Sequence, residues 1–135
     1  MFKNVIIICC IAVTLTSCPK PSPRITVRIV NNSNEDILWM CRIESNGEWY
    51  EIPSHPWTNK FGEKDYGLSL IKSGIIFEHK LTEAYKDHLK KGWSKYYFFN
   101  YDSVETIPWQ RICDERIILK EVRIDTWEDF EITYP

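Results

Sequence analysis

Apolar and polar residues alternate along several short stretches of the chain, which is the pattern of β-strands with one buried face. In residues 24–31 (RITVRIVN), Ile25, Val27 and Ile29 fall on the same face. Residues 37–44 (ILWMCRIE) repeat the alternation. The sequence therefore predicts two strands whose apolar faces contribute to a common core.

A tight turn follows the second of these strands. Asn46 and Gly47 both tolerate positive φ, as a two-residue type I′ hairpin turn requires. In the register that this turn sets, Arg42 lies opposite Glu51 on the polar face. We expect an antiparallel hairpin that ends at about Ile52.

The rest of the chain predicts further strands and two short helices. Strands are expected at residues 68–71, 75–79, 93–101, 117–124 and 130–134. One helix covers residues 82–91 with Thr82 as its candidate N-cap, and another runs from Thr106 to about Cys113. The predicted fold is mainly β: a single antiparallel, sandwich-like domain over residues 24–135 with two short helices, preceded by a signal-peptide helix.

The start of the chain has the layout of an export signal. Lys3 precedes residues 5–15, an eleven-residue run that is apolar except for one threonine. Such a run spans roughly half of the ~30 Å hydrocarbon layer, so it suits a signal peptide better than a membrane anchor. It ends in a four-residue box that resembles the bacterial lipoprotein signal, namely Leu15, Thr16, Ser17 and Cys18.

The lipoprotein resemblance implies a defined processing chemistry. The Cys18 thiol takes a diacylglyceryl group, a peptidase removes the signal peptide at residues 1–17, and the new amine is acylated. Two or three acyl chains then hold the protein on a membrane through Cys18. Residues 18–23 form a proline-rich tether before the globular domain. We expect a lipid-anchored protein of the bacterial cell envelope that faces the periplasm, on either the inner or the outer membrane.

Composition narrows the class of protein further. A length of 135 residues suits one domain, and a formal charge of −2 argues against a nucleic-acid partner. Two of the five cysteines lie in the signal peptide and Cys18 carries the lipid, which leaves Cys41 and Cys113 in the domain. In an oxidising envelope they form either a disulfide or two buried free thiols.

The C-terminal third resembles a family of small uncharacterised lipoproteins of Bacteroidetes. The resemblance is carried by Phe98–Val104 (FFNYDSV), Pro108-Trp109, Ile118–Lys120 and Glu131–Pro135 (EITYP). It implies an envelope location and a β-rich fold, and it brings no known activity. Within the first of these segments, Asp102-Ser103-Val104 resembles the O-glycosylation motif of Bacteroidetes, which makes Ser103 a candidate modification site.

Catalytic and metal-binding patterns are weak in this sequence. His55, His79 and His88 have no short spacing to another ligand of the kind that zinc sites use. The acidic pairs Asp102 with Glu105 and Asp114 with Glu115 fit caps and solvated helix ends better than acid–base catalysis. We therefore expect no catalytic residue, no metal and no cofactor, and a protein that is not an enzyme.

Aromatic side chains suggest a binding role instead. Trp49, Trp57 and Phe61 are candidate contacts for a sugar face or a partner, although rings in a small β-protein more often build the core. The sequence favours a non-enzymatic, lipid-anchored envelope protein that binds a protein partner. Two alternatives stay open: a small glycan- or ligand-binding module using these aromatics, and an inhibitor or immunity-type lipoprotein.

Overall fold

The computed structural model describes residues 24–43, 55–91 and 94–135. The predicted signal peptide, the predicted lipidation site Cys18, the predicted tether, the Asn46-Gly47 turn and Trp49 lie outside the described residues. Within the described part, the mainly β, sandwich-like fold class is confirmed. None of the helices in this part has the length and apolar character that a membrane crossing requires.

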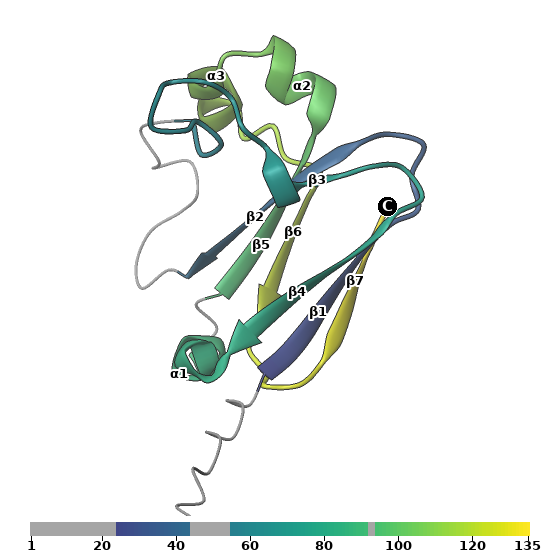
Figure 1. Ribbon diagram of the computed structural model, residues 1–135, viewed down its shortest axis with the longest axis vertical. Coiled ribbons are helices and arrows are strands. Elements are labelled where there is room, and N and C mark those ends of the chain that lie inside the picture. The colour runs from purple at the N-terminus through teal and green to yellow at the C-terminus, as the bar shows by residue number, and fades with distance from the viewer. Residues whose placement is uncertain (1–23, 44–54, 92–93) are drawn as a thin grey trace, which may run out of the picture.

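The first sheet has three strands in the order β4-β1-β7. Its centre is β1 (Arg24–Asn31), which pairs antiparallel with β4 (Ile76–Thr82) and parallel with β7 (Phe130–Tyr134). The parallel pair departs from the antiparallel domain that the sequence predicts. It arises because residues 125–129 carry the chain from the second sheet to the first, so that β7 lies beside β1 (Figure 1).

The second sheet has four antiparallel strands in the order β3-β2-β5-β6. These strands are β3 (Leu70–Ile71), β2 (Ile37–Ile43), β5 (Ser94–Asn100) and β6 (Lys120–Ile124). A 3-10 turn at Gly67–Ser69 leads into β3. The central strand β5 is almost entirely buried, because both faces of this sheet are covered.

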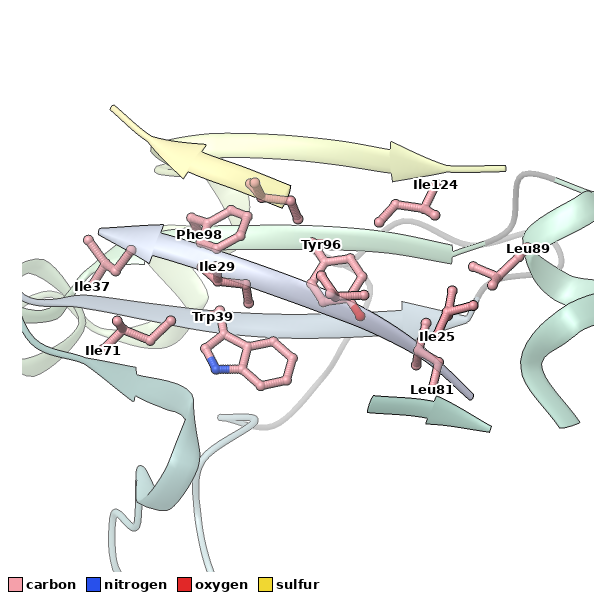
Figure 2. Packing of buried hydrophobic residues seen from close by; sticks show 12 residues of the cluster. Ile25, Ile29, Ile37, Trp39, Ile71, Leu81, Leu89, Tyr96, Phe98 and Ile124 are labelled. Carbon is pink, nitrogen blue, oxygen red and sulfur yellow. The ribbon is translucent and has the colours of Figure 1, made fainter. Parts of the chain in front are cut away.

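The main core lies between the two sheets. The alternation of β1 is confirmed, since Ile25, Val27 and Ile29 are at most 4% exposed. They belong to one buried cluster with Trp39 and Tyr96 of the second sheet. Figure 2 shows Ile25 and Ile29 in this layer. Removal of apolar surface from water contributes about 25 cal/mol per Å², so this layer stabilises the packing of the two sheets.

A second core covers the opposite face of the four-stranded sheet. Residues 55–66 lie over it together with α2 (Tyr101–Thr106) and α3 (Trp109–Asp114) (Figure 1). Its buried residues are Leu38, Met40, Trp57, Tyr97, Phe99, Val104, Trp109, Ile112 and Cys113. The strands β2 and β5 therefore contribute alternate residues to two different cores.

Helix α2 was not predicted from the sequence. Its N-cap is Asn100, whose Oδ1 accepts a hydrogen bond from the Ser103 N–H at 2.8 Å. Asp102 lies in the first turn, where a negative charge favours the helix dipole. The aromatic residues before Asn100 predict a strand that continues to Tyr101, so the sequence does not indicate a helix start here. The sequence predicts two helices, whereas the described residues form three α-helices.

The helix predicted over residues 82–91 forms in two parts. A 3-10 turn at Glu83–Tyr85 precedes α1 (Lys86–Lys90). Thr82 is the last residue of β4, and its side chain makes no cap hydrogen bond. Only Leu89 of this segment is fully buried, and it closes one end of the core between the sheets.

Candidate ligand-binding cavity

A cavity of about 420 Å³ lies between the edges of the two sheets, where β2 faces β4. Strand β2 contributes Trp39 and Cys41, strand β4 contributes His79 and Leu81, and Tyr85 of the following 3-10 turn completes this side. Trp39 spans the gap, with its ring centroid 4.8 Å from that of His79. The other side of the sandwich is closed differently, since Lys120 Nζ in β6 donates to the Thr133 carbonyl in β7 at 2.6 Å.

The register of the strands positions these side chains. Cys41 pairs with Tyr96 across β2 and β5, so that both side chains point into the space between the sheets. On β4, His79 pairs with Val27 of β1, whose side chain lies in the same core. Trp39 is fixed by its indole N–H, which donates to the Leu68 carbonyl at 2.9 Å.

A chain of polar groups connects three strands at the wall of the cavity. His79 Nδ1 lies 2.8 Å from the hydroxyl of Tyr96, which is fully buried. The same hydroxyl forms a hydrogen bond with the Cys41 thiol. The side-chain polar atoms that connect His79, Tyr96 and Cys41 thus have hydrogen-bond partners. A buried polar group without a partner would cost about 1–3 kcal/mol in desolvation.

Burial keeps the three groups uncharged near pH 7. It raises the pKa of the Cys41 thiol to about 11, and the hydrogen bond with Tyr96 is a smaller cause that acts in the opposite direction. Burial also raises the pKa of Tyr96 and lowers the pKa of His79. Because the thiolate is the reactive form of cysteine, this arrangement does not activate Cys41 as a nucleophile.

Of the three aromatic contacts predicted from the sequence, the two that lie in the described residues differ in exposure. Trp57 is only 6% exposed and packs in the second core, with its ring centroid 5.6 Å from Phe99 and 5.8 Å from Trp109. Trp57 also lines the cavity between β2 and β4, so its role as a ligand contact stays a prediction. Phe61 is 75% exposed, with Lys60 Nζ 5.0 Å from its ring centroid, and it does not line the cavity.

A disulfide between Cys41 and Cys113 is not formed. Both are free cysteines. Cys41 belongs to the core between the sheets and Cys113 to the core under α3, so the four-stranded sheet separates the two thiols. Of the two alternatives that the sequence left open, the structure has two free thiols, with Cys113 buried and Cys41 partly buried.

Ser103 lies in α2 and is half-buried. Its backbone N–H is engaged by Asn100 in the cap, as described above. No observation bears on modification of its hydroxyl, so O-glycosylation at this position stays a prediction.

A polar cluster ties residues 55–66 to α2. Glu105 accepts a hydrogen bond from the Tyr66 hydroxyl and pairs with Lys64 Nζ at 3.4 Å. The bond from Tyr66 is the main cause that lowers the pKa of Glu105. Beside this cluster, His55 packs among the rings of Trp57, Tyr66 and Trp109, and burial lowers its pKa.

Metal binding finds no support in the part of the chain that the structure describes. Residues 24–43, 55–91 and 94–135 contain no group of three or more His, Cys, Asp and Glu side chains that could hold an ion. His79 instead bonds to Tyr96, and His55 lies among rings.

Sequence reasoning missed His79 and Tyr96 as site residues. A signal was present, because Phe77, His79 and Leu81 alternate with charged residues and place the imidazole on an apolar face.

Comparison of the chain with family models, curated proteins and solved structures gives no match.

Proposed function

We propose that this protein is a lipid-anchored domain of a bacterial cell envelope that binds a small molecule in the cavity between β2 and β4. The observation that carries the proposal is the cavity of about 420 Å³ with aromatic and aliphatic walls and a few polar groups. Small-molecule sites typically have this size and composition, with polar groups that fix the ligand's orientation.

The chemistry of the walls supports binding without catalysis. Cys41 is held as a thiol, and His79 uses one ring nitrogen to bond Tyr96. A nucleophilic site needs a base that takes the proton of the nucleophile, whereas here the imidazole and the thiol both bond to the same phenol. The polar chain of this site is suited to orienting a ligand.

The envelope location rests on the lipoprotein signal that ends at Cys18. The globular domain begins with β1 at the end of the sandwich that carries α1, and β7 finishes at the opposite end (Figure 1). Residues 19–23 of the tether extend to about 15 Å if they adopt the polyproline conformation. The anchored end is then the α1 end, and the cavity opens along the side of the sandwich.

Ligand-observed NMR on the purified lipoprotein in nanodiscs tests the proposal, with a library of small uncharged and charged molecules. A cavity-filling variant, Ser69→Phe, places a ring on the cavity wall. Its matched control, Leu68→Phe, adds the same ring at a neighbouring position that is 77% exposed. We expect ligands that lose binding in Ser69→Phe and keep it in Leu68→Phe. Absence of any binder, or binding that ignores Ser69→Phe, would refute the proposal.

A protein partner is the second candidate, and the outer face of the first sheet favours it. That face has a hollow of about 460 Å³ lined mainly by charged side chains. At its centre Arg28 pairs with Glu131 at 3.3 Å and with Glu78 at 3.9 Å. A protein that binds this face should no longer bind the Arg28→Glu variant. An envelope pull-down followed by cross-linking measures this loss of binding. Inhibition of an incoming enzyme, as in an immunity-type lipoprotein, is one form that such a partnership takes.

A further inference from the structure

We infer that the ligand of this cavity is an uncharged molecule that presents a carbonyl-type oxygen to Nε2 of His79 and a flat apolar group to Trp39 and Tyr85. The inference rests on the proposed function and names the chemical class of the ligand. It follows from the charge of the walls, from the tautomer of His79 and from the ring surfaces around it.

The walls favour an uncharged ligand. Among the described residues that line the cavity, none is an aspartate, glutamate, lysine or arginine. The titratable Cys41 and His79 are neutral near pH 7 because burial opposes their charged forms. These described residues offer a charged ligand no countercharge, and an unpaired charge loses hydration when it enters an apolar site.

The hydrogen bonds around Tyr96 determine which nitrogen of His79 carries the proton. The phenol has one proton and two neighbours, the Cys41 sulfur and the His79 Nδ1. Thiol sulfur is a weak acceptor, whereas a neutral imidazole nitrogen is a good one. The phenol therefore donates to Nδ1, the thiol donates to the phenolic oxygen, and the proton of His79 resides on Nε2.

This tautomer makes Nε2–H a hydrogen-bond donor at the wall of the cavity. Nδ1 is occupied by Tyr96 and the imidazole lines the cavity, so a ligand meets the other ring nitrogen. An N–H donor in a partly dry site requires an acceptor, and a ligand oxygen supplies it at a net gain of about 1 kcal/mol. An apolar ligand of the same shape leaves this donor without its partner.

The rings beside His79 favour a flat apolar group on the same ligand. The indole N–H of Trp39 is already used by the Leu68 carbonyl, so Trp39 offers ring surface to the cavity. Tyr85 lines the cavity and is 36% exposed, and Leu81 is buried beside it. Planar groups pack on such surfaces by offset or edge contacts worth about 0.5–1.5 kcal/mol.

Four probes of similar shape, arranged in two pairs, test the inference on the lipoprotein in nanodiscs at pH 7. Benzamide and benzoate differ in charge, and acetophenone and ethylbenzene differ in the oxygen acceptor. We expect saturation-transfer NMR to give an affinity about tenfold higher for benzamide than for benzoate, and about fivefold higher for acetophenone than for ethylbenzene. In His79→Leu the preference for acetophenone should disappear while ethylbenzene binding stays.

The outcomes separate the inference from the proposed function. Equal binding of benzoate and benzamide, or a preference for acetophenone that survives in His79→Leu, overturns the inference and leaves a ligand cavity in place. Failure of all four probes overturns the inference and counts against the cavity as a binding site. Should His79→Leu not fold, ¹⁵N spectra of the unaltered protein decide the tautomer. A proton on Nδ1 of His79 would overturn the inference.

Discussion

His79 and Tyr96 connect the two sheets of the sandwich through a hydrogen bond of 2.8 Å between Nδ1 and the phenolic hydroxyl. The two residues belong to β4 and β5, which lie in different sheets and share no backbone pairing. The bond therefore joins the layers directly, and the Cys41 thiol extends it to β2. Stability, thiol reactivity and ligand orientation at the cavity should all depend on this one phenol.

Removing the phenolic hydroxyl should destabilise the protein. In Tyr96→Phe, His79 Nδ1 loses its partner inside the core, so we expect the free energy of unfolding to fall by about 1–3 kcal/mol. Chemical denaturation measures this change. The matched control Tyr85→Phe removes a hydroxyl from a ring that is 36% exposed, and it should stay within about 0.5 kcal/mol of the unaltered protein. Equal losses of unfolding free energy in the two variants would contradict a stabilising role for the hydrogen bond between Tyr96 and His79.

The Cys41 thiol should resist modification and make stability depend on alkaline pH. Its pKa is raised from 9.0 to about 11, so the folded state keeps a proton that the unfolded chain releases. The stabilisation is complete below pH 9 and is lost as the pH rises through 11. The test compares unfolding free energies of the unaltered protein and Cys41→Ala between these pH values. The steeper decline should belong to the protein that has the thiol, and parallel curves would contradict the raised pKa.

The cap of α2 should contribute to stability through one side chain. Asn100→Ala removes the acceptor for the Ser103 N–H, and we expect a loss of about 0.5–2 kcal/mol in the free energy of unfolding. Asn100 also donates to Glu35 Oε2 at 2.9 Å. Asn100→Ser is the matched control, since it keeps an acceptor for the cap and loses the contact to Glu35. If serine is as costly as alanine, the cap is not the source of the effect.

Truncation of Trp57 and truncation of Phe61 should change the free energy of unfolding by very different amounts. Trp57→Ala opens a cavity in the second core and should cost about 3–5 kcal/mol. Phe61→Ala removes a ring that is 75% exposed and should change stability by about 0.5 kcal/mol or less. Thermal and urea unfolding measure both variants. A small loss for Trp57→Ala would contradict its place in the core.

Lipid attachment at Cys18 is tested in the producing bacterium. In Cys18→Ala, radiolabelled palmitate should no longer be incorporated and the protein should leave the membrane fraction, because the acylated thiol is absent. Cys41→Ala is the control and should keep both the label and the fractionation. Label that persists in Cys18→Ala would rule out this anchor.

Local patterns were enough to predict most of the strands. The period-two alternation of β1 and the run that became β7 were found close to their observed bounds, since side-chain direction along a strand follows from the backbone itself. Helix α2 was missed because its cap, Asn100, ends an aromatic strand without a change in composition. The helix predicted over residues 82–91 forms as a 3-10 turn and the short α1, because Thr82 still belongs to β4.

The sequence by itself determined the class of fold and, through the box that ends at Cys18, the expectation of a lipid anchor, because both depend on neighbouring residues. Only the tertiary structure decided the parallel pairing of β1 with β7, the separation of Cys41 from Cys113 and the relay from Cys41 through Tyr96 to His79. These features join residues that are distant along the chain. Their positions relative to one another depend on how the two sheets pack, and no local sequence pattern specifies that packing.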